Sequence, residues 1–192
     1  MPSPIAHFGV GYAIYRYYKK KFPQGRRKFW KIPLQLVLVA GLSILPDLDV
    51  IPAIIFRNMK AYHNNISHSL LFAIPVALLV AGVFHRIYRS NFWFWFVICL
   101  FSYDLHVIMD SLTADRGVMM FWPLTETRVA SSVKIFYGLQ WGLGWFSPWH
   151  LWTVFTESLF VLVVILAVNY FIKRRDRSES QGSQEKQFRG DV

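Results

Sequence analysis

The run "NFWFWFVICLFSYDLHVIMDSLT", residues 91–113, decides what kind of fold this chain can adopt. Its first ten residues are apolar and aromatic, as in a helix that faces lipid, yet Asp104, His106 and Asp110 follow within the next ten. Ionisable side chains at membrane depth are costly, and they normally face a protein interior and serve a site or a pathway. The run therefore predicts a membrane helix with one polar, functional end.

Composition agrees with a membrane protein. The chain has 192 residues, of which 54% are hydrophobic and 18% aromatic, and this length suits one domain. The formal net charge is +10, but the basic residues flank the apolar runs, as the positive-inside rule expects, so no nucleic-acid partner is expected. Cys99 is the only cysteine, which excludes a disulfide or a thiolate metal site within one chain.

The apolar runs predict an all-α, polytopic membrane helix bundle with about five hydrophobic segments. These segments are residues 4–18, 32–56, 66–84, 91–112 and 151–172. A span needs roughly twenty residues, so the last three qualify alone and the first two need support from their neighbours. Pro46 and Pro52 should break or kink the second segment.

The ends of these segments define the domain and its orientation. We expect residues 1–172 to form the membrane-embedded domain and residues 173–192 to be a polar, disordered cytoplasmic tail. Lysines and arginines gather at residues 16–31, 86–89 and 173–177, which five spans place on one side, the cytoplasmic side. This predicts an integral protein of the plasma (inner) membrane with its N-terminus outside. The connection at residues 113–149 either lies along the interface or packs as an ordinary loop.

The same topology brings the ionisable groups of the apolar segments to the opposite, non-cytoplasmic side. They are His7, Asp47, Asp49, His63, His68, Asp104, His106, Asp110, His150 and Glu157. His106 and Asp110 are four residues apart, so they share one face of a helix. Each motif alone is often an ion pair, a capped turn or a packing histidine. Together they favour a metal site over a structural polar cluster.

The donor types restrict the metal. Imidazole and carboxylate without thiolate suit zinc, manganese or iron, and the number of candidate ligands predicts more than one divalent ion. Such a centre activates water and binds a phosphoryl or carbonyl oxygen. A carboxylate that is left over from metal binding can act as a general base, for which Asp49 and Glu157 are the candidates.

Three motifs carry a resemblance to a known family. "PDLD" at 46–49, "HNNISHS" at 63–69 and "HVIMDSLT" at 106–113, with "PIAH" at 4–7, resemble the YdjM-type membrane-bound metal-dependent hydrolases over about residues 1–125. That family is similar to zinc-dependent phospholipases C, which are helical enzymes with a trinuclear zinc centre. The resemblance implies that the metal site is lined by His7, Asp47, Asp49, His63, His68, His106 and Asp110.

One departure from the family pattern concerns the second motif. Where "HRG" is expected before "THS", this chain has Asn64 and Asn65 after His63. The missing arginine and glycine bear on phosphate binding and on the geometry of this loop.

The sequence thus predicts a membrane-bound, metal-dependent hydrolase of an ester or phosphoester at the non-cytoplasmic face. His106 and Glu157 lie about 10 Å below the surface at 1.5 Å per residue, which is the level of lipid head groups, so the substrate is a lipid or a water-soluble ester. Ion or metal transport is the first alternative, although "LLFAIPVALLVAGVF" at 70–84 and "LFVLVVILAV" at 159–168 offer no polar path. A structural membrane protein with a polar helix-packing cluster is the second.

Overall fold

The computed structural model describes residues 2–23, 33–139, 144 and 147–190. Its elements are α1 (Pro4–Tyr18), α2 (Leu34–Leu42), η1 (Leu45–Asp49), α3 (Val50–Ile55), α4 (Met59–Tyr62), η2 (Ile66–His68), α5 (Leu70–Tyr88), α6 (Phe92–Ser111) and α7 (Pro148–Gly190). Extended pairing in this part of the chain is limited to two isolated bridges, Thr113 with Phe136 and Val118 with Val129. The prediction of an all-α bundle is confirmed.

The described residues contain fewer candidate membrane spans than the sequence has predicted hydrophobic segments. Among the described residues, α5, α6 and α7 are long and apolar enough to cross a membrane, and a fourth span exists if α2 and the segment Leu45–Ile55 count as one. That pair is bent by 61° next to Pro46, where the sequence predicts a break. Helix α1 has 15 residues, which is short for a span. The count of five is therefore approximate.

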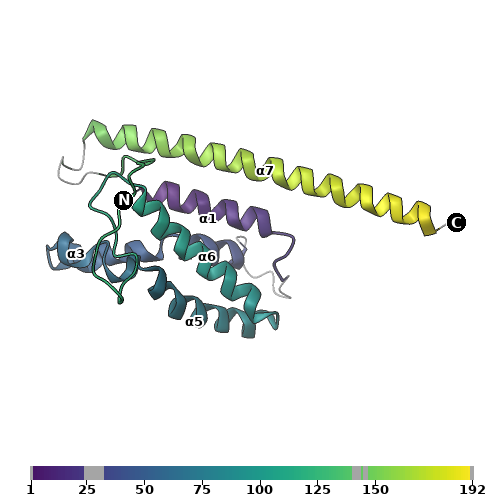
Figure 1. The fold of residues 1–192 in the computed structure, drawn as a ribbon, viewed down its shortest axis with the longest axis horizontal. Helices are drawn as coiled ribbons and strands as arrows, with labels where there is room; N and C mark the ends of the chain where they lie inside the picture. Colours follow the sequence, from purple (N-terminus) through teal and green to yellow (C-terminus); the bar gives the residue numbers. More distant parts are fainter. Residues whose placement is uncertain (1, 24–32, 140–143, 145–146, 191–192) are drawn as a thin grey trace.

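The helices alternate in direction and give the bundle two different ends. Helices α1 and α7 run parallel, since Ser3 contacts Glu157 and Arg16 contacts Asn169. Helices α5 and α6 are antiparallel neighbours (Figure 1). We call the end with the starts of α1, α5 and α7 the polar end, because the predicted ligands lie there.

The other end of the bundle is called the basic end. The ends of α1 and α5 and the part of α7 after its apolar run carry Arg16, Lys19, Lys20, Lys21, Arg86, Arg89, Lys173, Arg174, Arg175 and Arg177. Four further residues of the predicted basic clusters, Arg26, Arg27, Lys28 and Lys31, lie outside the described residues. The described basic clusters thus gather at one end of the bundle, and the side of the membrane that this end faces stays a prediction. Helix α7 continues through Gly190, and the division of the chain at residue 172 also stays a prediction.

Small residues allow the helices to pack closely around the polar end. Ala73, Ala77 and Ala81 repeat every four residues on α5 and are almost fully buried, in keeping with the close packing of α5 against α6. A Cβ atom at Gly9 would lie 2.4 Å from the Val161 side chain, so a larger residue there would separate α1 from α7. This close approach seats α1, and with it His7, inside the bundle.

The connection between α6 and α7 covers the polar end. Its backbone pairs with the start of α5 and the end of α6, with Leu70 N 3.0 Å from Met120 O and Ser131 N 2.8 Å from Ser111 O. Val118, Met120 and Phe136 are buried. The described part of the connection thus packs on the polar end, while Leu124, Val133 and Ile135 are exposed, and a position along the membrane interface stays a prediction. Residues 140–143, 145 and 146 of this connection lie outside the described part.

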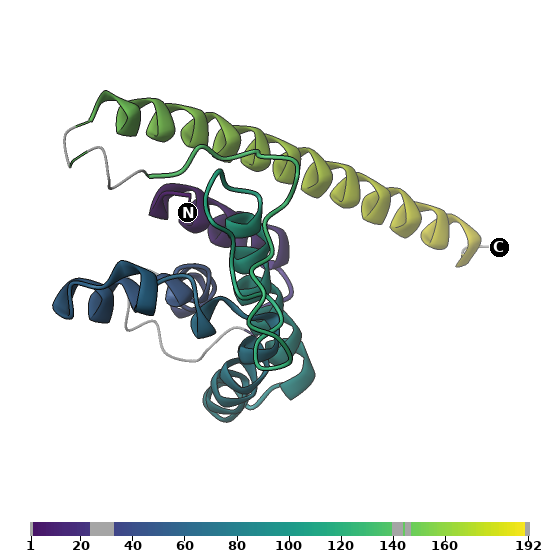
Figure 2. The ribbon, with the colours of Figure 1, turned by 60° about the vertical axis from the view of Figure 1, so that its left-hand side comes forward.

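The segment from η1 to α4 leaves the bundle sideways at the polar end (Figure 2). Many of its exposed side chains are large and apolar, among them Leu48, Ile51, Ile54, Ile55 and Phe56, and Arg57 and Asn58 are exposed beside them. The same is true of the outer faces of the spans, where Leu79, Val97 and Leu162 are exposed. Such surfaces are stable in lipid and not in water, which fits a membrane protein.

Candidate metal centre

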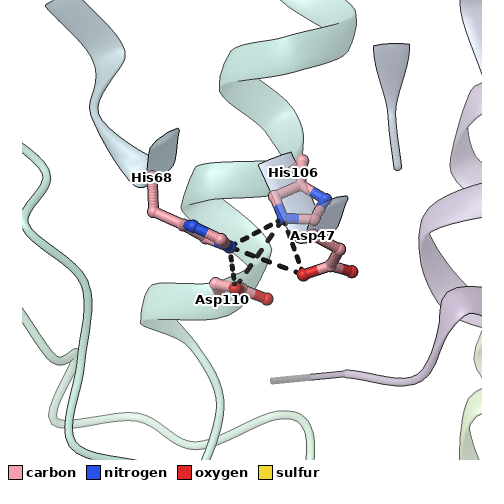
Figure 3. A group of neighbouring side chains, drawn as sticks. All are labelled: Asp47, His68, His106 and Asp110. Carbon is pink, nitrogen blue, oxygen red and sulfur yellow. Dashed lines mark hydrogen bonds and ion pairs between the residues drawn. The ribbon is translucent and has the colours of Figure 1, made fainter. Parts of the chain in front are cut away.

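Four of the predicted ligands meet at the polar end of the bundle. Asp47 comes from η1, His68 from η2, and His106 and Asp110 from α6 (Figure 3). One ligand atom from each lies within 4.8 Å of the other three, and all four side chains are buried. A group of two imidazoles and two carboxylates with this spacing can hold a metal ion.

The local fold of "PDLD" explains how two carboxylates turn toward the interior. In the 3-10 turn of η1, Asp47 is buried and Asp49 is largely buried, while Leu48 between them is 51% exposed. A regular α-helix would separate the directions of residues 47 and 49 by about 200°. The break that Pro46 introduces is thus what brings both aspartates inward.

The nitrogen atoms of the two histidines converge. Nε2 of His68 lies 3.2 Å from Nε2 of His106. His68 Nε2 is also 3.0 Å from Asp110 Oδ2 and 3.5 Å from Asp47 Oδ1. His106 Nε2 is 3.5 Å from the same Asp47 oxygen and 3.7 Å from the same Asp110 oxygen. Two nitrogens and two oxygens therefore face one small volume.

Hydrogen bonds on the far side of each ring fix which nitrogen carries the proton. His106 Nδ1 lies 2.8 Å from the carbonyl oxygen of Ser43, which can only accept. His68 Nδ1 lies 3.1 Å from a carboxylate oxygen of Asp49. In the neutral rings, both Nε2 atoms then present lone pairs to each other and to two carboxylates. This arrangement is repulsive unless a cation lies among the four atoms.

The electrostatics of His68 lead to the same conclusion. Burial by itself lowers the pKa of this imidazole, but the carboxylates of Asp110, Asp47 and Asp49 raise it well above its usual value. The surroundings of His68 therefore attract a positive charge strongly. A proton on the ring and a metal ion at Nε2 are the two ways in which this charge can be supplied.

His7 approaches the two aspartates from the opposite side. It is fully buried, and its ring stacks on that of His106 with 3.8 Å between the centroids. Its Nε2 is 3.3 Å from Asp110 Oδ1 and 4.0 Å from Asp47 Oδ2. These are the carboxylate oxygens that do not face His68 and His106. Neither nitrogen of His7 makes a hydrogen bond of normal geometry within the described structure.

Asp49 and His63 lie behind His68, outside the four-residue group. One oxygen of Asp49 contacts His63 Nδ1, and the other accepts hydrogen bonds from Ser67 Oγ at 2.6 Å and from the backbone N–H of Asn64 at 3.0 Å. Asp49 thus meets His68 at Nδ1, on the far side from the group. A direct role for Asp49 or His63 in binding a metal stays a prediction.

The turn in which this chain departs from its family pattern is held by an arginine from elsewhere. Asn64 has a φ of 59°, in the left-handed region that asparagine tolerates better than most residues. Arg128 Nη1 donates to the carbonyl of Asn64 and to that of Gly117, both at 3.0 Å, and Nη2 contacts the side chain of Asn65. A guanidinium group is therefore present beside this turn, supplied by the connection between α6 and α7.

Glu157 is buried at the same end but has other partners. Its carboxylate accepts hydrogen bonds from the backbone N–H of Ser3 at 2.8 and 3.0 Å, and it also contacts the Ser3 hydroxyl. It thereby ties α7 to the start of α1. His150 contacts the carbonyl of Gly144 at 2.9 Å, and Asp104 lies half-buried on α6 outside the group. The predicted catalytic role of Glu157 stays a prediction.

Sequence reasoning missed two residues that orient the group. Ser43 acts through its backbone carbonyl, which no side-chain pattern reveals. Arg128 acts on a turn more than sixty residues away in sequence. Its surroundings in the sequence, "TETRVASS" at 125–132, give no signal of this contact.

Comparison with known proteins places the chain in a family. A family model described as YdjM inner membrane protein matches residues 1–177. The chain belongs to the YdjM inner membrane protein family. This YdjM-family chain is also 31% identical over 139 residues to the inner membrane protein YbcI of Escherichia coli (strain K12), which covers 67% of the chain and 71% of that relative. No solved structure matches the chain with significance.

The family assignment confirms the resemblance that the motifs predicted. It also agrees with the apolar helices in making this YdjM-family chain an integral inner membrane protein. The names of the family and of YbcI state a location and no reaction.

Proposed function

We propose that the group formed by Asp47, His68, His106 and Asp110 binds a divalent metal ion and that the protein is a membrane-bound, metal-dependent hydrolase. One observation carries this proposal: two histidine Nε2 atoms lie 3.2 Å apart among carboxylate oxygens, while their Nδ1 atoms are occupied elsewhere. The donors contain no thiolate, so zinc, manganese and iron are the ions that suit them.

The pattern of oxygens supports more than one ion. Asp47 Oδ1 and Asp110 Oδ2 face His68 and His106, whereas Asp47 Oδ2 and Asp110 Oδ1 face His7. Among the described residues, none of these four oxygens makes a hydrogen bond of normal geometry. Buried polar atoms in folded proteins rarely lack a hydrogen-bond partner. If two ions were bound, Asp47 and Asp110 would offer one oxygen to each of them, and His7 would be a ligand of the second.

The surrounding residues would prepare the site for hydrolysis. A bound divalent ion supplies Lewis-acid chemistry that stabilises negative charge on a carbonyl or phosphoryl oxygen. Asp49 holds His68 and Ser43 holds His106 with Nε2 toward the ion, as outer hydrogen-bond partners of metal-binding histidines commonly do. The predicted role of Asp49 as a general base stays a prediction, since one of its oxygens contacts His63 and the other accepts hydrogen bonds from Ser67 and Asn64.

The substrate is proposed to be a lipid ester or phosphoester at the non-cytoplasmic face. The group lies at the end of the spans, where head groups and upper acyl chains are found. Leu48, between the two aspartates of η1, is exposed, as are Ile51 and Ile54 of α3. An apolar surface of this kind would let a lipid lie beside the segment that carries Asp47 and Asp49.

Metal content and hydrolysis test this proposal together. Protein purified in detergent without chelator should contain at least one equivalent of zinc, manganese or iron and should release head groups from labelled membranes. His68→Ala should lose both properties. His85→Ala is the matched control, because His85 is an exposed histidine on α5 at the basic end. His7→Phe, which keeps a stacking ring, should lose one ion and retain the other.

Other outcomes would favour the alternatives. Absence of metal from the wild-type protein would leave a helix-packing cluster of protonated histidines and carboxylates. Uptake of metal ions by proteoliposomes would indicate transport. The described structure gives transport little support, because the buried face of α6 beyond the group is mainly Tyr103, Cys99, Ile98 and Trp95.

A further inference from the structure

A second candidate site lies at the basic end, far from the metal centre. A hollow of about 550 Å³ opens between α1 and α7. It is lined by Arg16, Lys173 and Arg177, with Asn169, Ser180 and Ile172 beside them. None of these residues belongs to the proposed metal centre.

The lining has an excess of positive charge. Three of the lining side chains are cationic and one, Asp176, is acidic. Asp176 is already paired with Lys20, whose Nζ lies 2.9 Å from its carboxylate, and Arg175 Nε is 3.7 Å from the same oxygen. Glu179 lies near Arg175, at 3.8 Å, and does not line the hollow. The hollow therefore suits an anion.

Contacts between the two helices fix the shape of the hollow. Arg16 donates one hydrogen bond, from Nη2 to Asn169 at 2.9 Å, and keeps further N–H groups for a ligand. Arg175 bonds the carbonyl of Tyr17 at 3.4 Å and lies over the Tyr17 ring, 5.5 Å from its centroid. Lys173 and Arg177 contribute no side-chain bond between α1 and α7 within the described structure. Their charges are therefore available to a ligand without loss of the helix contact.

The position of the hollow along α7 indicates which anion it meets. The apolar run of α7 ends at Ile172, and the exposed aromatic side chains of Tyr170 and Phe171 lie just before it. Aromatic residues gather at the level of lipid head groups, and basic clusters directly beyond a span attract anionic lipids. Below this level α7 exposes Leu162 and Leu166, along which acyl chains can lie.

We propose that the hollow binds the head group of an anionic phospholipid. Arg16, Lys173 and Arg177 contact the phosphate, and Asn169 and Ser180 offer polar groups beside it. In the orientation that the basic clusters predict, this lipid belongs to the cytoplasmic leaflet. The site then fixes α7 against α1 by a lipid bridge, at the end of the bundle opposite to the metal centre.

Thermal unfolding of the full-length protein in detergent tests this proposal. Dioctanoyl phosphatidylglycerol should raise the Tm, since a ligand that binds only the folded state stabilises it. Dioctanoyl phosphatidylcholine and inorganic phosphate at equal concentration should have little effect. In the double variant Lys173→Gln, Arg177→Gln, the concentration of phosphatidylglycerol that gives the same rise in Tm should increase about tenfold or more.

The control variant carries the same loss of charge outside the hollow. Arg86→Gln with Arg174→Gln removes two cations from exposed positions at the basic end and should respond as the wild type does. Equal weakening in both double variants would overturn the proposal in favour of general charge attraction. An equal Tm rise with phosphatidylcholine, or with inorganic phosphate, would also overturn it. Metal content should stay at the wild-type value in both variants. Failure of the lipid proposal can therefore be distinguished from failure of the proposed hydrolase.

Discussion

Asp110 and Glu157 are two buried carboxylates at the same end of the bundle, and they differ in what surrounds them. Asp110 is 2% exposed and Glu157 is 1% exposed. Glu157 accepts hydrogen bonds from the N–H and hydroxyl of Ser3. Both oxygens of Asp110 lack a hydrogen bond of normal geometry within the described structure and face the histidines His7 and His68.

The difference separates structural carboxylates from candidate ligands. Burial alone makes both residues costly, and each must be compensated. Hydrogen-bond donors from the chain already compensate Glu157, so it needs no ion. Asp110 has imidazoles as its neighbours, and these donate nothing when their proton sits on the other nitrogen. A candidate metal ligand is therefore recognised here as a buried carboxylate that receives no hydrogen bond of normal geometry from the described part of the chain.

The largest effect that tests this comparison is loss of metal in Asp110→Asn. The substitution removes a negative charge and replaces one carboxylate oxygen by an amide nitrogen, which cannot bind a cation. Metal affinity should fall by more than the ~100-fold that loss of an outer hydrogen-bond partner costs. Elemental analysis of the purified variant measures this. Glu157→Gln should keep its metal, because the amide oxygen still accepts from Ser3.

Asp104→Asn is a second control on the same helix, since Asp104 lies outside the group. Equal loss of metal in the Asp110 and Glu157 variants would show that the two carboxylates do not differ in the way proposed.

A smaller effect is expected at Asp49, which touches the group only through His68. Asp49→Asn weakens the acceptor that keeps the proton on His68 Nδ1 and Nε2 toward the group. Outer partners of this kind change metal affinity by about 10–100-fold, so the apparent dissociation constant should rise by that factor. Titration of metal-free protein with zinc measures it. The control is Asp115→Asn, an exposed aspartate in the neighbouring connection. Complete loss of metal from Asp49→Asn would instead make Asp49 a direct ligand.

Local chemistry made much of the site predictable. All four residues of the group are among the seven that the motifs single out, because metal ligands are side chains of a few types with restricted spacing. His106 and Asp110 share a helix face by spacing alone. The inward turn of Asp47 follows from the break at Pro46, which the sequence also predicts.

The remaining features depend on contacts between distant residues, which no local pattern contains. Glu157 had the burial and the side of the bundle expected of a catalytic base, and only its contact with Ser3 shows that it has partners already. Of the seven candidates, four lie within the group, His7 lies behind Asp47 and Asp110, and Asp49 and His63 lie behind His68. Differences of a few ångströms separate these positions. For the fold, the predicted segments 4–18 and 91–112 agree with α1 and α6, whereas α7 continues to Gly190, beyond the apolar run that predicts an end at residue 172.

The smallest effect tests the structural side of the comparison, in Ser3→Ala. The substitution removes the hydroxyl that contacts Glu157 and leaves the backbone N–H, which still donates to the carboxylate. Losing one hydrogen bond to a buried charged group should lower the free energy of unfolding by about 1–3 kcal/mol. Thermal unfolding in detergent measures this change, and metal content should be unaltered. A loss of metal without a loss of stability would mean that Ser3 and Glu157 position His7, on the next turn of α1, more strictly than they hold α1 to α7.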